Sequence, residues 1–110
     1  VLAASRFISS VTFNKTSFAE FIFPASLNGQ FNVILMVNWI HHIEPTELKK
    51  YIEKYFSENL LENGCIVIDT VQAPSYKFNH EIHFLTSGLS RKLVKIGDYE
   101  NQREIHAIFK

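Results

Sequence analysis

The sequence predicts an α/β fold, in which a mostly parallel sheet is flanked by helices and closed by an antiparallel hairpin. Two almost unbroken apolar runs, Phe31–Val37 and Cys65–Val71, are typical of strands that are buried on both faces. An amphipathic helical pattern lies between them, and two strands joined by a helix form a right-handed parallel crossover. Alternating segments at Leu93–Ile96 and Glu104–Phe109 predict the hairpin, with its turn in GDYENQ.

The patterns before the first apolar run are weaker. Val1–Ser10 is compatible with the end of a helix, and Val11–Phe13 is a short strand candidate. Turn signals such as Asn28-Gly29 follow, so we expect a packed loop or a helical turn there.

The helix between the two runs is predicted over Pro45–Asn59. Proline suits the first helical position, where its missing N–H needs no partner. Apolar residues recur on one face at helical spacing, namely Leu48, Ile52, Tyr55 and Phe56. We expect Asn63-Gly64 to end the connection to the second strand, because glycine tolerates a left-handed turn. A shorter helix is predicted within Asn79–Leu89, with Ile82, Leu85 and Leu89 on one face.

Composition limits the classes of function. The chain has 110 residues, ten of them Phe, and a formal net charge of zero, which suits one domain with a hydrophobic core. Without a basic stripe, composition gives no support for binding to a phosphate backbone. The longest apolar runs are much shorter than the roughly 20 residues that span a bilayer, and no signal-peptide pattern is visible, so we expect a cytoplasmic protein. The single cysteine, Cys65, cannot form an internal disulfide and is expected in the core.

Polar residues follow both apolar runs, at the point where each predicted strand ends. The first run is followed by Asn38, Trp39, His41 and His42, and the second ends near Asp69, Thr70 and Gln72. Ligands of parallel sheets bind just beyond the carboxyl ends of the strands. The sequence therefore predicts a binding site at this edge.

These residues also have structural interpretations. Asn38 can end its strand by hydrogen bonding within the turn, and Trp39 can be a core aromatic residue. A structural hydrogen bond is the favoured role for Asp69. Either His41 or His42 can serve as a general base, because histidine titrates near neutral pH. Neighbouring residues of a helix point about 100° apart, so the two histidines are not expected to share a metal.

The remaining histidines give weaker signals. His80 and His83 are three positions apart, whereas the metalloprotease motif needs four with the Glu between, so no metal is expected. His106 lies between Ile105 and Ala107 on a predicted strand, so we expect it on the surface.

The segment FNVILMVNWIHHIEPTELKKYIEKYFSENLLENGCIVIDTV resembles the fourth strand, the following helix and the fifth strand of class I S-adenosylmethionine-dependent methyltransferases. LVKIGDYENQREIHAIFK is similar to the antiparallel sixth and seventh strands of that family. The resemblance implies a partial Rossmann-like methyltransferase sheet. Residues 1–110 would form one incomplete methyltransferase domain that lacks the N-terminal cofactor-loop half, since the four glycines are isolated.

The resemblance also implies a function, which is methyl transfer from S-adenosylmethionine to a small polar acceptor. The implied cofactor contacts are Asn38, Trp39 and, if VTFNKTSF matches the third strand, Ser17. The general-base candidates are His42 and His41, and the implied acceptor contacts are Tyr76, His80 and His83.

An alternative is a non-catalytic fragment or partner subunit that keeps half of the fold for assembly. Neither nucleic acid nor a membrane is expected as a partner, whereas an uncovered sheet edge favours self-association. Because the glycine turn and the ribose-binding acid have no counterpart, the isolated chain is expected to bind S-adenosylmethionine weakly or not at all.

Overall fold

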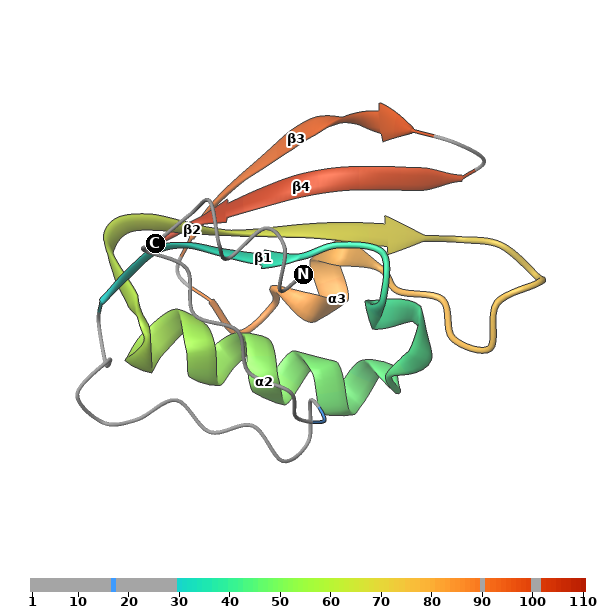
Figure 1. Cartoon of the computed structure of the whole chain (residues 1–110), viewed down its shortest axis with the longest axis horizontal. Helices are drawn as coiled ribbons and strands as arrows, with labels where there is room; N and C mark the ends of the chain where they lie inside the picture. Colours follow the sequence, from blue (N-terminus) through green and yellow to red (C-terminus); the bar gives the residue numbers. More distant parts are fainter. Residues whose placement is uncertain (1–16, 18–29, 90, 100–101) are drawn as a thin grey trace, which may run out of the picture.

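The computed structural model describes Ser17 and residues 30–89, 91–99 and 102–110, so the predictions for Val1–Ser10 and Val11–Phe13 lie outside the described residues. The described part forms a four-stranded mixed sheet in the order β1-β2-β4-β3 (Figure 1). Its elements are β1 (Phe31–Met36), η2 (Ile40–His42), α2 (Pro45–Glu58), β2 (Leu60–Val71), α3 (Ile82–Leu85), β3 (Lys92–Tyr99) and β4 (Arg103–Phe109). None of the helices among these residues is long and apolar enough to cross a bilayer.

The pairing of the strands confirms the parallel β1–β2 pair, but the prediction of a mostly parallel sheet is wrong, because the other two pairings of the described sheet are antiparallel. β1 and β2 are parallel, with Met36 opposite Ile68. β4 pairs antiparallel with both β2 and β3, so the C-terminal hairpin joins the sheet through its second strand. The hairpin is longer than the sequence predicts, because β3 continues to Tyr99 and includes part of the expected turn.

Helix α2 confirms the predicted start and the predicted buried face. It begins at Pro45 and buries Leu48, Ile52, Tyr55 and Phe56. The carboxylate of Glu44 accepts hydrogen bonds from the backbone N–H groups of Thr46 and Glu47, at 3.1 and 3.2 Å. These bonds satisfy donors of the first turn, which have no partner inside the helix. The Thr46 hydroxyl donates to the same carboxylate, and this contact is the main cause of a lowered pKa for Glu44.

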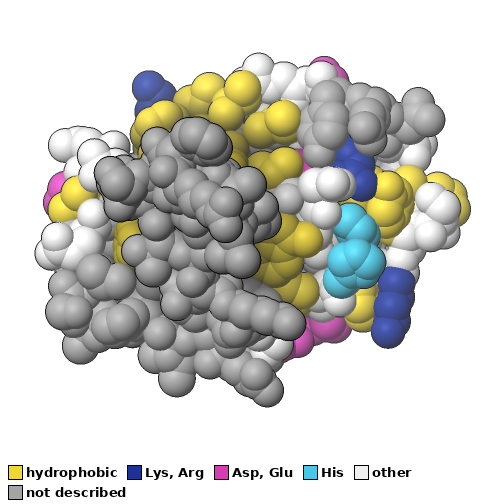
Figure 2. Space-filling model, viewed as in Figure 1, with side chains coloured by type: hydrophobic (Ala, Val, Ile, Leu, Met, Phe, Trp, Pro, Cys, Tyr) yellow, Lys and Arg dark blue, Asp and Glu magenta, His cyan; other side chains and the backbone are white. Residues whose placement is uncertain are grey.

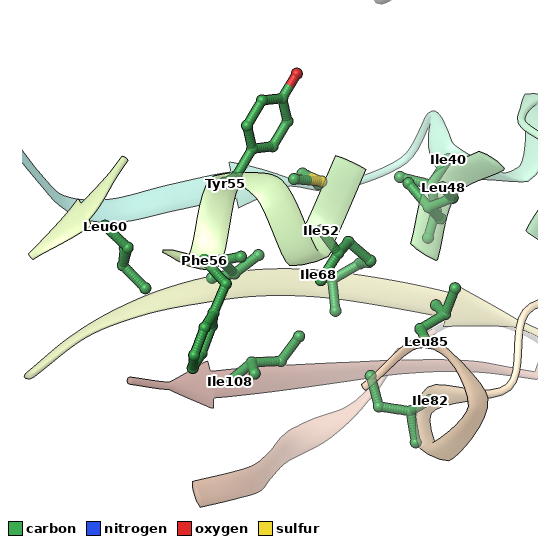
Figure 3. Packing of buried hydrophobic residues seen from close by; sticks show 12 residues of the cluster. Ile40, Leu48, Ile52, Tyr55, Phe56, Leu60, Ile68, Ile82, Leu85 and Ile108 are labelled. Carbon is green, nitrogen blue, oxygen red and sulfur yellow. The ribbon is translucent and has the colours of Figure 1, made fainter. Parts of the chain in front are cut away.

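The hydrophobic core lies between α2 and one face of the sheet. Figure 3 shows Ile52 beside Ile68 and Phe56 pointing toward Ile108. The short helix α3 adds Ile82 and Leu85 to the same cluster. Burying each such side chain contributes about 1.5–3 kcal/mol, so this face accounts for much of the stability of the described fold.

The expectation that both faces of the first apolar run are buried is wrong. Val33 and Leu35 of β1 are 54% and 66% exposed. β1 is an edge strand of the described sheet, and helices α2 and α3 lie on one side of that sheet (Figure 1). Met36 belongs to the core that these helices form with the sheet, whereas Val33 and Leu35 do not. An unbroken apolar run therefore does not guarantee two covered faces.

The second strand begins earlier than predicted. β2 starts at Leu60, and Asn63-Gly64 lies within it instead of ending a loop. Asn63 has a φ of 65°, and the register with β1 shifts between Phe31 and Val33. A Cβ atom on Gly64 would lie 2.9 Å from the carbonyl oxygens of Asn32 and Leu61, so only glycine fits without a shift of the backbone. Cys65, next to it, is half-buried and does not belong to the core cluster, so its expected place in the core is wrong.

Candidate functional site

A polar cluster lies at the carboxyl edge of the parallel strands. Its members are Asn38 after β1, Asp69 near the end of β2, Tyr76 in the loop after β2 and Arg103 at the start of β4. We call these four residues the Arg103 cluster. Exposed histidine side chains lie on the right of the molecule in the space-filling view, the side on which β2 ends in Figure 1 (Figure 2).

The guanidinium of Arg103 joins the other three members of the cluster. Its Nη1 atom donates to Asn38 Oδ1 and to Asp69 Oδ2, at 2.9 Å each, and its Nη2 atom donates to the Tyr76 hydroxyl at 2.7 Å. It also lies 5.2 Å from the centre of the Tyr76 ring. The Arg103 and Asp69 side chains are only 5% and 3% exposed. Burying two charges is costly, and this pair offsets the cost through hydrogen bonds in good geometry.

Asp69 also fixes the turn that follows β1. Asn38 has a φ of 67°, a left-handed conformation that asparagine tolerates better than most residues. Its backbone N–H donates to Asp69 Oδ1 at 2.9 Å. The favoured structural role of Asp69 is therefore confirmed, while the Asn38 side chain remains exposed at the edge.

His41 and His42 belong to the single turn η2, beside the cluster. The His41 ring lies edge-on to the Tyr76 ring, 4.7 Å between centres, and 4.2 Å from the His42 ring. Partial burial lowers the pKa of His41, and the neighbouring His42 and Arg103 lower it further. His41 is therefore neutral near pH 7 and can accept a proton, whereas His42 is exposed to solvent.

The other residues with a predicted cofactor role lie in different surroundings. Trp39 is half-buried and packs against the hydrophobic core. Ser17 is exposed. A cofactor contact remains a prediction for both residues.

The predicted acceptor contacts separate in the structure. Tyr76 joins the Arg103 cluster, but His80 is fully buried, and its Nε2 atom lies 2.9 Å from the Ile43 carbonyl oxygen. Burial lowers the pKa of His80, so a neutral ring donates to that carbonyl. His80 thus links the loop after η2 to the start of the α3 region, and its position does not support contact with an acceptor. His83 is exposed on α3.

The expectation that His106 is a surface residue is wrong. It is 5% exposed and lies opposite Ile68 in the sheet, on the face where the helices pack. Neither ring nitrogen has a hydrogen-bond partner among the residues that the structure describes. Burial lowers the pKa of His106, so the neutral form is favoured.

Arg103 is the functional candidate that the sequence analysis misses. It lies 65 positions from Asn38 and 34 from Asp69 in the sequence. Only the insertion of β4 beside β2 brings them together. A single arginine next to a predicted turn gives no periodic signal, although a buried acid such as Asp69 does require a cationic partner.

Two further observations concern metal binding and cavities in the described part of the chain. Among the described residues, no three His, Cys, Asp or Glu side chains gather in a way that could hold a metal ion. A cavity of about 260 Å³ lies at the opposite end of the strands, near the starts of β2 and β3 and the end of β4. It is lined by Asn63, Lys92, Phe109 and Lys110. The Arg103 cluster is therefore separate from that cavity.

Comparisons of the chain with protein-family models, with curated proteins and with solved structures found no match. The geometry itself defines the class, which is a small α/β domain with a four-stranded mixed sheet and a polar cluster at the carboxyl edge of its parallel strands.

Proposed function

We propose that the chain is the carboxyl-terminal part of an S-adenosylmethionine-dependent methyltransferase that acts on a small polar acceptor in the cytoplasm. The observation that carries the proposal is the position of the Arg103 cluster beside His41. Both lie where the parallel strands β1 and β2 end, which is the usual ligand edge of such sheets. The antiparallel hairpin next to β2 is compatible with the sixth and seventh strands to which the sequence is similar.

The residues present fit one side of the cofactor. Asn38 offers an exposed side-chain amide at the strand end, and Trp39 offers an aromatic ring beside it. No glycine-rich turn stands in the sequence to approach the cofactor from the other side. We therefore expect this chain to supply the acceptor-side wall of the site.

His41 is the proposed general base. S-adenosylmethionine, when bound, supplies an electrophilic methyl group. A hydroxyl or ammonium acceptor must lose a proton when it is methylated, and the lowered pKa of His41 keeps a ring nitrogen free to take it near pH 7. The Tyr76 ring holds the His41 ring from its edge, which favours one orientation of the base.

The test is methyl transfer from methyl-labelled S-adenosylmethionine by the full-length protein, with a panel of small hydroxyl and amine acceptors. We expect His41→Gln to lower kcat by about 10²–10⁴, the range of general-base catalysis, with unfolding free energy nearly unchanged. His42→Gln is the matched control and should cost less, because His42 is exposed. The proposal is wrong if the wild-type protein transfers no label.

A second candidate function is favoured by the edge strand. Val33 and Leu35 are large apolar side chains exposed on β1, at the edge of the described sheet. Such an edge favours pairing with another chain, as expected for a non-catalytic partner subunit. Light scattering across a range of protein concentrations tests it. Leu35→Lys should lower the average mass if β1 pairs, and an unchanged mass contradicts pairing through β1.

A further inference from the structure

We propose that Arg103 is a positioning residue that makes Asn38 and Tyr76 into two hydrogen-bond donors, so that the site takes a group with oxygen lone pairs. A carboxylate or a carbonyl is the chemical class that fits. The inference rests on the proposed function for the reaction that these donors serve. It concerns binding, however, and can be measured without methyl transfer.

The direction of the Asn38 amide follows from the chemistry of arginine. A guanidinium has N–H donors and no acceptor, so the atom that lies 2.9 Å from Nη1 must be the amide oxygen. The other terminal atom of this exposed side chain is therefore the amide nitrogen, Nδ2. Its two hydrogens are left for a ligand at the edge of the sheet.

Arg103 also leaves the Tyr76 hydroxyl as a hydrogen-bond donor toward a ligand. It accepts a hydrogen bond from Nη2 at 2.7 Å, and arginine supplies the proton of that bond. The phenolic hydrogen must therefore point to a different atom. Because Tyr76 is only half-buried, an atom of a ligand can be that acceptor.

The local charge favours a carboxylate or carbonyl over a cation. Asp69 pairs with Arg103, so the cluster carries both signs, and the neutral His41 adds no charge near pH 7. An ammonium group has only donors and would meet two further donors. Lysine cannot replace Arg103, because one ammonium does not reproduce the planar fork that holds three acceptors at once.

The test is nuclear magnetic resonance of the isotope-labelled chain during titration with sodium acetate, to roughly 0.1 M, where millimolar affinities are measurable. Methylammonium chloride is the donor-only probe, and sodium chloride controls for ionic strength. We expect acetate alone to shift the Asn38 side-chain amide and the Tyr76 ring signals progressively. No shift with acetate, or equal shifts with either other salt, overturns the proposal.

Two substitutions test the role of Arg103 itself. Arg103→Lys should reduce the acetate-induced shifts at Asn38 and Tyr76 by about fivefold or more. Arg91→Lys, the same chemical change before the other strand of the hairpin, should leave them unchanged. Equal shifts in Arg103→Lys and wild type overturn the proposal.

A milder variant covers the case in which Arg103→Lys does not fold. Tyr76→Phe keeps the pair of Arg103 with Asp69 and removes one of the two donors. The acetate-induced shift of the Asn38 amide should fall in this variant, and an unchanged shift contradicts the paired-donor site. A wild-type protein that binds acetate in this way but transfers no methyl group would support this inference and refute the proposed function.

Discussion

Arg103 and His106 lie on the same strand, β4, and are equally buried, at 5% exposure each. Arg103 has hydrogen-bond partners on three other segments, whereas the ring nitrogens of His106 have none within the described part of the chain. A buried polar group without a partner lowers stability, and a buried ion pair stabilises only while both charges remain. The comparison indicates that the start of β4 is organised around a polar site. His106, in contrast, lowers the free energy of unfolding because it is buried without a hydrogen-bond partner among the described residues.

The largest expected effect comes from breaking the buried pair. Asp69→Ala should lower the free energy of unfolding by about 3–5 kcal/mol, because the Arg103 charge is then buried without its counter-ion. Asp98→Ala removes an exposed partner of Lys95 and should cost less than about 1 kcal/mol. Urea denaturation measures both. Equal costs would mean that the Asp69–Arg103 pair is not buried in solution.

A somewhat smaller effect is expected in the apolar core. Ile52→Ala should cost roughly 2–4 kcal/mol, because it deletes methyl groups that pack beside Ile68 and leaves a cavity (Figure 3). Lys50→Ala, on the exposed face of α2, should change stability by less than about 0.5 kcal/mol. The assignment of the buried helix face fails if the two variants unfold at the same urea concentration.

Replacement of His106 is expected to raise stability, whereas the two preceding substitutions lower it. His106→Leu should raise the free energy of unfolding by about 1 kcal/mol at neutral pH, since two unpartnered ring nitrogens leave the core. His83→Leu, on the exposed surface of α3, is the control and should have little effect. A destabilised His106→Leu protein would indicate that the ring has a partner in solution.

The buried histidines also predict the pH dependence of stability. Burial holds the pKa of both His80 and His106 below the unfolded value near 6.5. The unfolded chain therefore binds more protons than the folded one below that pH. Stability should be complete above about pH 6.5 and fall as the pH drops toward the folded pKa values. The fall should be smaller in His106→Leu, and identical pH profiles would exclude His106 as a cause.

The sequence predicts those features that depend on local periodicity. The buried face of α2 follows from a spacing of 3.6 residues, and the parallel pairing of β1 with β2 follows from two apolar runs around that helix. The exposure of Val33 and Leu35 is not predicted, because a run of apolar residues does not show which strand lies at an edge.

The candidate site is predicted only in part, for a related reason. Asn38, Asp69 and His41 follow from the rule that strand ends bind ligands, since each lies near the end of a predicted strand or just beyond it. The contacts of Arg103 and the burial of His106 depend on where β4 inserts beside β2. Contacts between distant segments leave no periodic pattern in one sequence, so neither could be predicted.

We propose that the ligand site lies where β1 and β2 end and that this chain forms one wall of it. Titration of the labelled 110-residue chain with S-adenosylmethionine, followed by nuclear magnetic resonance, tests both parts. We predict shifts at Asn38, Trp39 and His41 that are not saturated at about 1 mM, as expected for weak binding. Saturable binding at micromolar cofactor would contradict the proposal that this chain forms only one wall of the site. Shifts confined to the cavity of Asn63 and Lys92 would contradict the assignment of the site.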